Sequence, residues 1–146
     1  GFIAASEPVI HYIKHTSRPL IFSASPPPAS VAAVSAAIDI IQQEPERLER
    51  LWHNTKKMLA GLRALGFNTG DSVTPVIPVI VGDDERAFQV GRMLHDRGVF
   101  ANVVVSPAVP AGMALIRTSY MATHTDEHLD RVLEVFGSVG RELGII

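Results

Sequence analysis

The stretch Ser106-Pro-Ala-Val-Pro-Ala-Gly-Met-Ala-Leu-Ile-Arg-Thr-Ser-Tyr-Met-Ala-Thr-His-Thr125 leads from a proline-stiffened loop into a strand and then toward a helix start. Alternation from Met113 to Tyr120 predicts a β-strand that places Leu115, Arg117 and Ser119 on one face. A guanidinium stays charged and offers paired donors that match the two oxygens of a carboxylate. Arg117 is therefore a candidate carboxylate-binding residue, although an arginine on a strand is more often a solvated or structurally paired charge.

The chain after Pro45 predicts a two-layer unit with helices covering one face of a small sheet. Apolar residues repeat at three and four residues along a long helix that ends at Gly66, a C-cap residue. Five further elements are expected: a strand over 76–81 held to a sheet edge by Pro78, a helix capped by Asp83 or Asp84 that stops at Gly98, strands over 99–105 and 113–120, and a last helix capped by Thr123 or Thr125.

The segment before Pro45 does not fit that unit, and we expect it to be the edge of another domain. Residues 6–15 predict a short helix, and residues 18–28 predict an apolar strand-like piece that runs into a rigid loop with three prolines. Residues 29–43 predict a buried, alanine-rich helix.

Composition narrows the class of protein. The 146 residues are 47% hydrophobic and 19% charged with a formal net charge of −2, and the basic residues are scattered, so neither nucleic acid nor a membrane is an expected partner. Cysteine is absent, which excludes disulfides and thiolate chemistry. We find no apolar stretch long enough to span a bilayer and no signal peptide, and we expect a cytoplasmic protein. The start at Gly1 without methionine predicts a fragment of something longer.

Few residues predict chemistry by themselves. His11 and His15 have a spacing that can bind zinc, but no third ligand is evident, so a metal site is disfavoured. For His124 we expect a side chain that bonds backbone at its turn. Ser23 and Ser25 are hydroxyls on a proline-stiffened loop that can donate to a phosphate oxygen, with turn-stabilising bonds as the commoner use. None of the three lysines has the pattern of a desolvated imine-forming amine.

Five stretches together resemble the α-oxoamine synthases, which are fold-type I pyridoxal-phosphate enzymes that condense an amino acid with an acyl-CoA and release carbon dioxide. The stretches are Gly1-Phe2, Ser17-Arg-Pro-Leu-Ile-Phe-Ser-Ala-Ser-Pro-Pro27, Leu62-Arg-Ala-Leu-Gly-Phe67, Thr74-Pro-Val-Ile-Pro-Val-Ile-Val-Gly82, and Pro107-Ala-Val-Pro-Ala-Gly112 continuing through Arg117 to Thr125. The resemblance implies an α/β fold in which residues 1–45 are the tail of the large cofactor-binding domain. Residues 46–146 would be the C-terminal small domain, with a mainly antiparallel sheet.

The resemblance also implies roles for single residues. Arg117 would bind the substrate α-carboxylate, and Ser25, with Ser23 less firmly, would reach the phosphate of pyridoxal phosphate in the partner subunit of a homodimer. Pro26 and Ala24 depart from the family's usual leucine and threonine. The imine-forming lysine would lie upstream of Gly1, so we expect the fragment alone to be inactive. Two alternatives stay open: an aminotransferase of the same fold, and a non-enzymatic binding or dimerisation module in which Arg117 neutralises a nearby acid.

Overall fold

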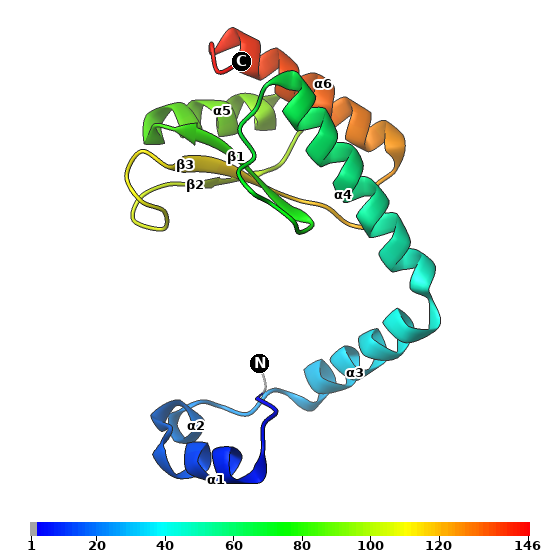
Figure 1. Cartoon of the computed structure of the whole chain (residues 1–146), viewed down its shortest axis with the longest axis vertical. Helices are drawn as coiled ribbons and strands as arrows, with labels where there is room; N and C mark the ends of the chain where they lie inside the picture. The colour runs from blue at the N-terminus through cyan, green and yellow to red at the C-terminus, as the bar shows by residue number, and fades with distance from the viewer. Residues whose placement is uncertain (1–2) are drawn as a thin grey trace. The chain divides into compact units, whose positions relative to one another are not determined.

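The computed structural model describes residues 3–146, so the predicted match at Gly1-Phe2 lies outside the described residues. The chain divides into two units, Gly1–Gln42 and Gln43–Ile146, which we call unit 1 and unit 2. Figure 1 follows the order of helices and strands along the chain.

Unit 1 is helical. It contains α1 (Glu7–Thr16), α2 (Arg18–Phe22) and most of α3 (Pro28–Gln43). The expectation of a strand-like piece over 18–28 is wrong, because Arg18–Phe22 form the helix α2. Pro19 lies in the first turn of this helix, where its missing N–H has no intrahelical partner to lose. Residues 3–42 also contain no strand with which this segment could pair. The expectation that residues 29–43 form a buried helix is right for the helix and wrong for the burial. None of the residues of α3 is buried, because no element of unit 1 covers its apolar side chains.

Unit 2 begins with α4 (Pro45–Leu65), which starts at the predicted break and ends at Gly66 in the left-handed conformation with φ of 102°. Then follow β1 (Val76–Gly82), α5 (Asp84–Asp96), β2 (Asn102–Val104), β3 (Ala114–Ser119) and α6 (Asp126–Glu142). The strands form one antiparallel sheet in the order β1-β3-β2. The predicted order of elements and the edge position of the strand with Pro78 are confirmed.

The core of unit 2 lies between the sheet and its helices. Helix α5 packs on all three strands, and α6 packs on α5 and α4 (Figure 1). Fully buried side chains come from every layer: Met58, Leu62, Ile77, Leu94, Ile116, Leu129 and Phe136. One face of the sheet is therefore covered, which leaves the other face open within this unit.

Strand β2 is shorter than the predicted 99–105. Gly98 is left-handed with φ of 83°, and the Val99 N–H donates to the Leu94 carbonyl oxygen at 2.9 Å. This turn and this bond hold the start of the segment at the end of α5, and only residues 102–104 pair with β3.

Candidate functional site

Arg117 lies in the middle of β3, the central strand, on the open face of the sheet. Its neighbours across the ladder are Pro78 on β1 and Asn102 on β2. Residues 114, 116 and 118 of the same strand are buried toward the helices, whereas Arg117 and Ser119 are exposed. The predicted split of the strand into two faces is confirmed.

The guanidinium of Arg117 is not engaged by an acid. Among the described residues 3–146, no carboxylate lies within ion-pair distance of it, and the same holds for the arginines at 18, 63, 86 and 141. The arginines at 47, 50, 92, 97 and 131 each have an acidic partner. No neighbour in unit 2 neutralises this charge. Its paired donors are free for a carboxylate that comes from outside the unit.

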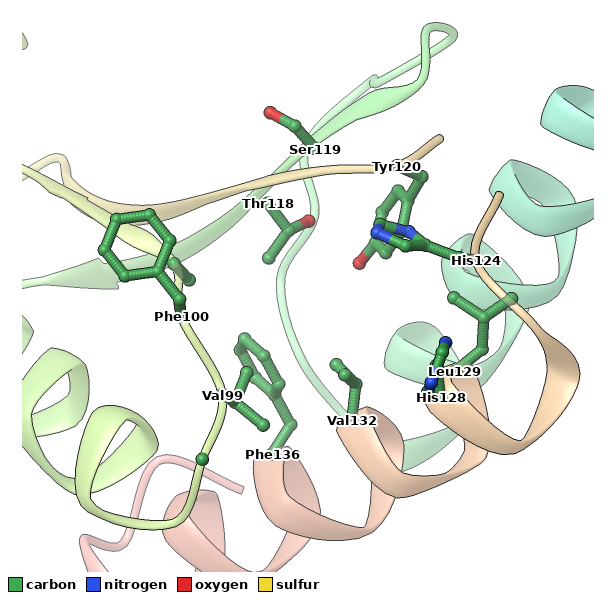
Figure 2. Close-up of a pocket in the computed structure, with 12 residues that line it drawn as sticks. Val99, Phe100, Thr118, Ser119, Tyr120, His124, His128, Leu129, Val132 and Phe136 are labelled. Atoms are coloured by element: carbon green, nitrogen blue, oxygen red, sulfur yellow. The ribbon is translucent and has the colours of Figure 1, made fainter. Parts of the chain in front are cut away.

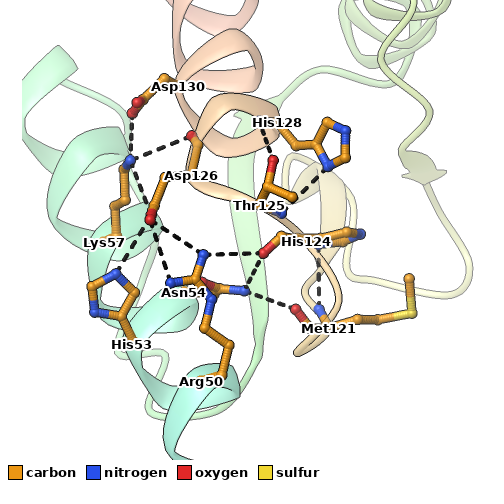
Figure 3. Close-up of polar contacts among 10 residues, drawn as sticks. All are labelled: Arg50, His53, Asn54, Lys57, Met121, His124, Thr125, Asp126, His128 and Asp130. Carbon is orange, nitrogen blue, oxygen red and sulfur yellow. Dashed lines mark hydrogen bonds and ion pairs between the residues drawn. The ribbon is translucent and has the colours of Figure 1, made fainter. Parts of the chain in front are cut away.

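The turn that follows β3 is fixed to α4 by a buried amide. Asn54 is fully buried, and its Nδ2 donates to the carbonyl oxygens of Met121 at 2.9 Å and His124 at 3.0 Å (Figure 3). Arg50 Nη2 donates to the same His124 oxygen at 3.4 Å. We call Asn54 with the turn 121–124 the Asn54 lock, and it ties the end of the arginine-bearing strand to the long helix.

A cluster of charges surrounds the lock on its α4 side. Asp126 lies 3.3 Å from Arg50, 3.4 Å from Lys57 and 3.5 Å from His53, while Lys57 Nζ lies 2.6 Å from Asp130 (Figure 3). Desolvation pushes the pKa of Asp126 upward, but hydrogen bonds from Arg50 and Lys57 outweigh it, so its pKa lies below the usual value.

Lys57 is a cation in this cluster. The hydrogen bond to Asp130 and the contacts with Asp126 raise its pKa, so it stays protonated. An amine that forms an imine must lose that proton, which excludes Lys57 from the role and agrees with the expectation from sequence.

The two histidines near the turn have structural roles. Met121 N donates to His124 Nδ1 at 3.3 Å, which confirms the predicted backbone bond. Thr125 caps α6, because its Oγ1 accepts from His128 N while His128 Nδ1 accepts from Thr125 N, both at 3.3 Å. Of the two threonines predicted as caps, Thr125 is therefore the one used.

Ser23 and Ser25 lie in unit 1, in the loop between α2 and α3. Both are exposed, and Ser23 ends α2 with its N–H donating to the Pro19 carbonyl oxygen at 3.0 Å. Within the described residues neither hydroxyl makes a hydrogen bond, so both are free to donate to an anion. His11 and His15 stack with centroids 4.3 Å apart, and the described part of the chain contains no group of three metal-binding side chains.

Sequence reasoning missed Asn54 and Asp126. Asn54 falls on the inward side of the predicted long helix, where a polar residue amid leucines was the available signal. Asp126 at the start of α6 gave no such signal, because an acid in a first helical turn is ordinary.

Comparisons with known proteins agree with this architecture. The model of the family "Aminotransferase class I and II" matches residues 1–136. An 8-amino-7-oxononanoate synthase of Symbiobacterium thermophilum is 48% identical over 146 residues, which is 100% of this chain and 37% of that protein. A serine palmitoyltransferase of Bacteriovorax stolpii is 49% identical over 136 residues, which is 93% of this chain and 32% of that protein.

A solved structure is similar over nearly the same range. Serine palmitoyltransferase from S. paucimobilis, with a bound PLP–myriocin aldimine, superimposes with a TM-score of 0.88 at 35% identity and covers 98% of this chain and 36% of that one. The chain thus spans about a third of the length of the proteins that it matches. Among residues 3–146, no helix is both long enough and apolar enough to cross a membrane.

Proposed function

Because the chain belongs to the aminotransferase class I and II family, we propose that it is the substrate-carboxylate-binding part of a pyridoxal-phosphate-dependent acyltransferase. The relatives are those of the α-oxoamine synthase group, and pyridoxal phosphate is the cofactor of that group. The proposed reaction joins serine, glycine or alanine to an acyl-CoA with loss of carbon dioxide. A homodimer in the cytoplasm belongs to the same proposal. The assignment of residues 1–45 and 46–146 to a large and a C-terminal small domain stays a prediction.

The free guanidinium of Arg117 carries the proposal. It stands on the central strand, where pairing on both sides fixes the backbone, and no acid of the described residues uses its donors. A bidentate grip on an amino acid's carboxylate fixes the direction of the bond between the α-carbon and the carboxyl carbon. Arg117 would therefore select amino acids and set which bond is broken.

The hydroxyls of Ser23 and Ser25 suit the phosphate group of pyridoxal phosphate. Two free hydroxyls, on Ser23 and Ser25, sit on a loop that ends in three consecutive prolines, so a phosphate oxygen could be bound there at small entropic cost. Bound pyridoxal phosphate supplies an electron sink for a carbanion at the α-carbon. The described residues hold no candidate for the imine-forming lysine, since Lys57 is ion-paired and Lys14 and Lys56 are exposed on helices.

The test compares the 146-residue chain with the protein that the whole gene encodes. We expect the chain alone to give no imine absorbance with pyridoxal phosphate, and the whole protein to give a band that borohydride removes. The whole protein should consume acyl-CoA and release carbon dioxide. An active protein that transfers amino groups without consuming acyl-CoA would favour the aminotransferase instead.

Arg117→Lys keeps the charge and loses the paired donors. In the whole protein we expect the KM for the amino acid to rise about tenfold or more, with the KM for acyl-CoA nearly unchanged. Arg131→Lys, on an exposed ion pair, is the matched control. Equal effects of the two substitutions would contradict the assigned role of Arg117.

A further inference from the structure

Unit 2 contains a pocket beside the end of β3 that Arg117 does not line. It has a volume of about 160 Å³ and lies between the end of β3, the segment that joins α5 to β2, and α6 (Figure 2). Its apolar walls include Val99, Val132 and Phe136, and its polar residues are Thr118, Ser119, Tyr120 and the histidines at 124 and 128. Lysine, arginine and carboxylate side chains do not line it.

The phenol of Tyr120 is the group that points to a ligand. Tyr120 is 8% exposed, and its hydroxyl is buried without a hydrogen-bond partner in the described chain. Figure 2 shows this hydroxyl directed into the space between Thr118 and the helix that carries Val132. The Thr118 hydroxyl, which donates to the Ile77 carbonyl oxygen at 2.8 Å, lies near enough to lower the Tyr120 pKa slightly, but it makes no hydrogen bond with the phenol. A buried hydroxyl without a partner is costly, so an acceptor is missing here.

The imidazoles at the pocket are also donors. In each ring Nδ1 accepts a backbone N–H, from Met121 for His124 and from Thr125 for His128. A nitrogen that accepts carries no hydrogen, so the ring hydrogen of each lies on Nε2. Burial raises the pKa of Tyr120 to about 12, so the phenol also keeps its hydrogen. The polar side of the pocket therefore offers hydrogen-bond donors, and no lysine or arginine lines it.

We propose that this pocket binds a small neutral carbonyl compound, with its oxygen on the Tyr120 hydroxyl and its short apolar body against Val99, Val132 and Phe136. The volume is close to that of a cavity that holds a benzene ring, so about six non-hydrogen atoms fit. A carboxylate is disfavoured, because no lysine or arginine lines the pocket to compensate the desolvation cost of its charge. A neutral amide or ketone loses much less on leaving water.

The test is an NMR titration of the 146-residue chain with butyramide, which has a carbonyl, six non-hydrogen atoms and no charge. We expect saturable shifts of the His124 and His128 ring signals, and binding at least about fivefold weaker for butyrate. Tyr120→Phe should weaken butyramide binding about fivefold or more, because it removes one hydrogen bond to a buried acceptor. Tyr12→Phe is the matched control, since Tyr12 is exposed on α1 in unit 1 and should leave binding unchanged.

Ala101→Leu gives a second test that keeps the phenol. Ala101 lines the pocket and is only partly buried, so a larger side chain there should fill the space and abolish binding. The proposal fails if butyramide causes no saturable shift, if Tyr120→Phe binds it as tightly as the unchanged chain, or if butyrate binds more tightly than butyramide.

Discussion

Replacing Asn54 with alanine should loosen the joint between α4 and the turn after β3. The substitution removes two hydrogen bonds, to the carbonyl oxygens of Met121 at 2.9 Å and His124 at 3.0 Å. Neither oxygen is left alone, because Met121 O still accepts from His124 N at 3.3 Å and His124 O from Arg50 at 3.4 Å. The cost is therefore close to that of two ordinary bonds, about 2 kcal/mol.

That cost converts into a measurable shift in melting temperature. Unit 2 runs from residue 43 to 146, which is 104 residues. With an unfolding entropy of about 2.1 cal/mol/K per residue, about 2 kcal/mol lowers the melting temperature of this unit by about 9 °C. Urea unfolding followed by circular dichroism, with the transition of unit 2 fitted separately, gives the free energy of unfolding directly.

Two further variants separate the hydrogen bonds from the volume of the side chain. Asn54→Asp keeps the size but turns a carboxylate oxygen toward the two carbonyl oxygens, so we expect a loss of about 3 kcal/mol or more. His53→Ala, the neighbouring exposed residue, should cost less than about 0.5 kcal/mol. The assignment of the lock is refuted if Asn54→Ala loses no more stability than His53→Ala, or if Asn54→Asp is as stable as the unchanged chain.

Two more predictions concern the core of unit 2. Burial raises the folded-state pKa of Tyr120 to about 12 from 10.0, so the unfolded state loses the phenol proton at lower pH than the folded state does. The free energy of unfolding should therefore fall by about 2 kcal/mol between pH 10 and 12. In urea titrations Tyr120→Phe should abolish that part of the fall, and a variant with the same pH profile as the unchanged chain would contradict the prediction. Gly140→Ala should destabilise unit 2 by about 1–3 kcal/mol, because the added Cβ would lie 2.5 Å from Phe67 Cζ and 2.9 Å from Ile146 Cγ1. Gly137→Ala on the same helix meets only a Leu65 methyl at 3.2 Å and the Arg141 guanidinium, so thermal melts should show a clearly smaller loss, and equal losses would count against the packing argument.

Local signals in the sequence were sufficient for the architecture of unit 2. Gly66, Asp83 and Pro78 each act within a few residues of their own position. Gly66 is a left-handed C-cap, the Asp83 carboxylate is an N-cap that accepts from Arg86 N at 2.9 Å, and Pro78 is an edge-strand residue. Such residues predict where a helix or strand begins or ends, because capping and the loss of a backbone N–H depend only on residues nearby in the sequence.

Features that depend on distant partners were not predictable. Residues 18–22 are apolar enough for a strand, but a strand needs a ladder, and α2 forms where none is available. The Asn54 lock joins residues 67 and 70 positions apart, and no spacing rule connects them. Likewise, alternation predicted the exposed face of Arg117, but only the packed unit shows that no acid of the described residues pairs with it.

The exposure of Arg117 and the packing of the core both depend on the register of β3 in the sheet. Ala114, Ile116 and Thr118 are buried against the helices while Arg117 lies on the open face. A slip of one residue would bury the guanidinium and expose Ile116. The free-energy cost of burying an unpaired charge is far larger than the stabilisation that one hydrogen bond of the sheet provides. Pairing with β1 and β2 on both sides and the Asn54 lock at the strand's end both oppose that slip. The packing that stabilises unit 2 therefore also holds Arg117 on the open face. For this reason we expect substitutions at Asn54 to alter both the free energy of unfolding and the proposed carboxylate binding in the whole protein.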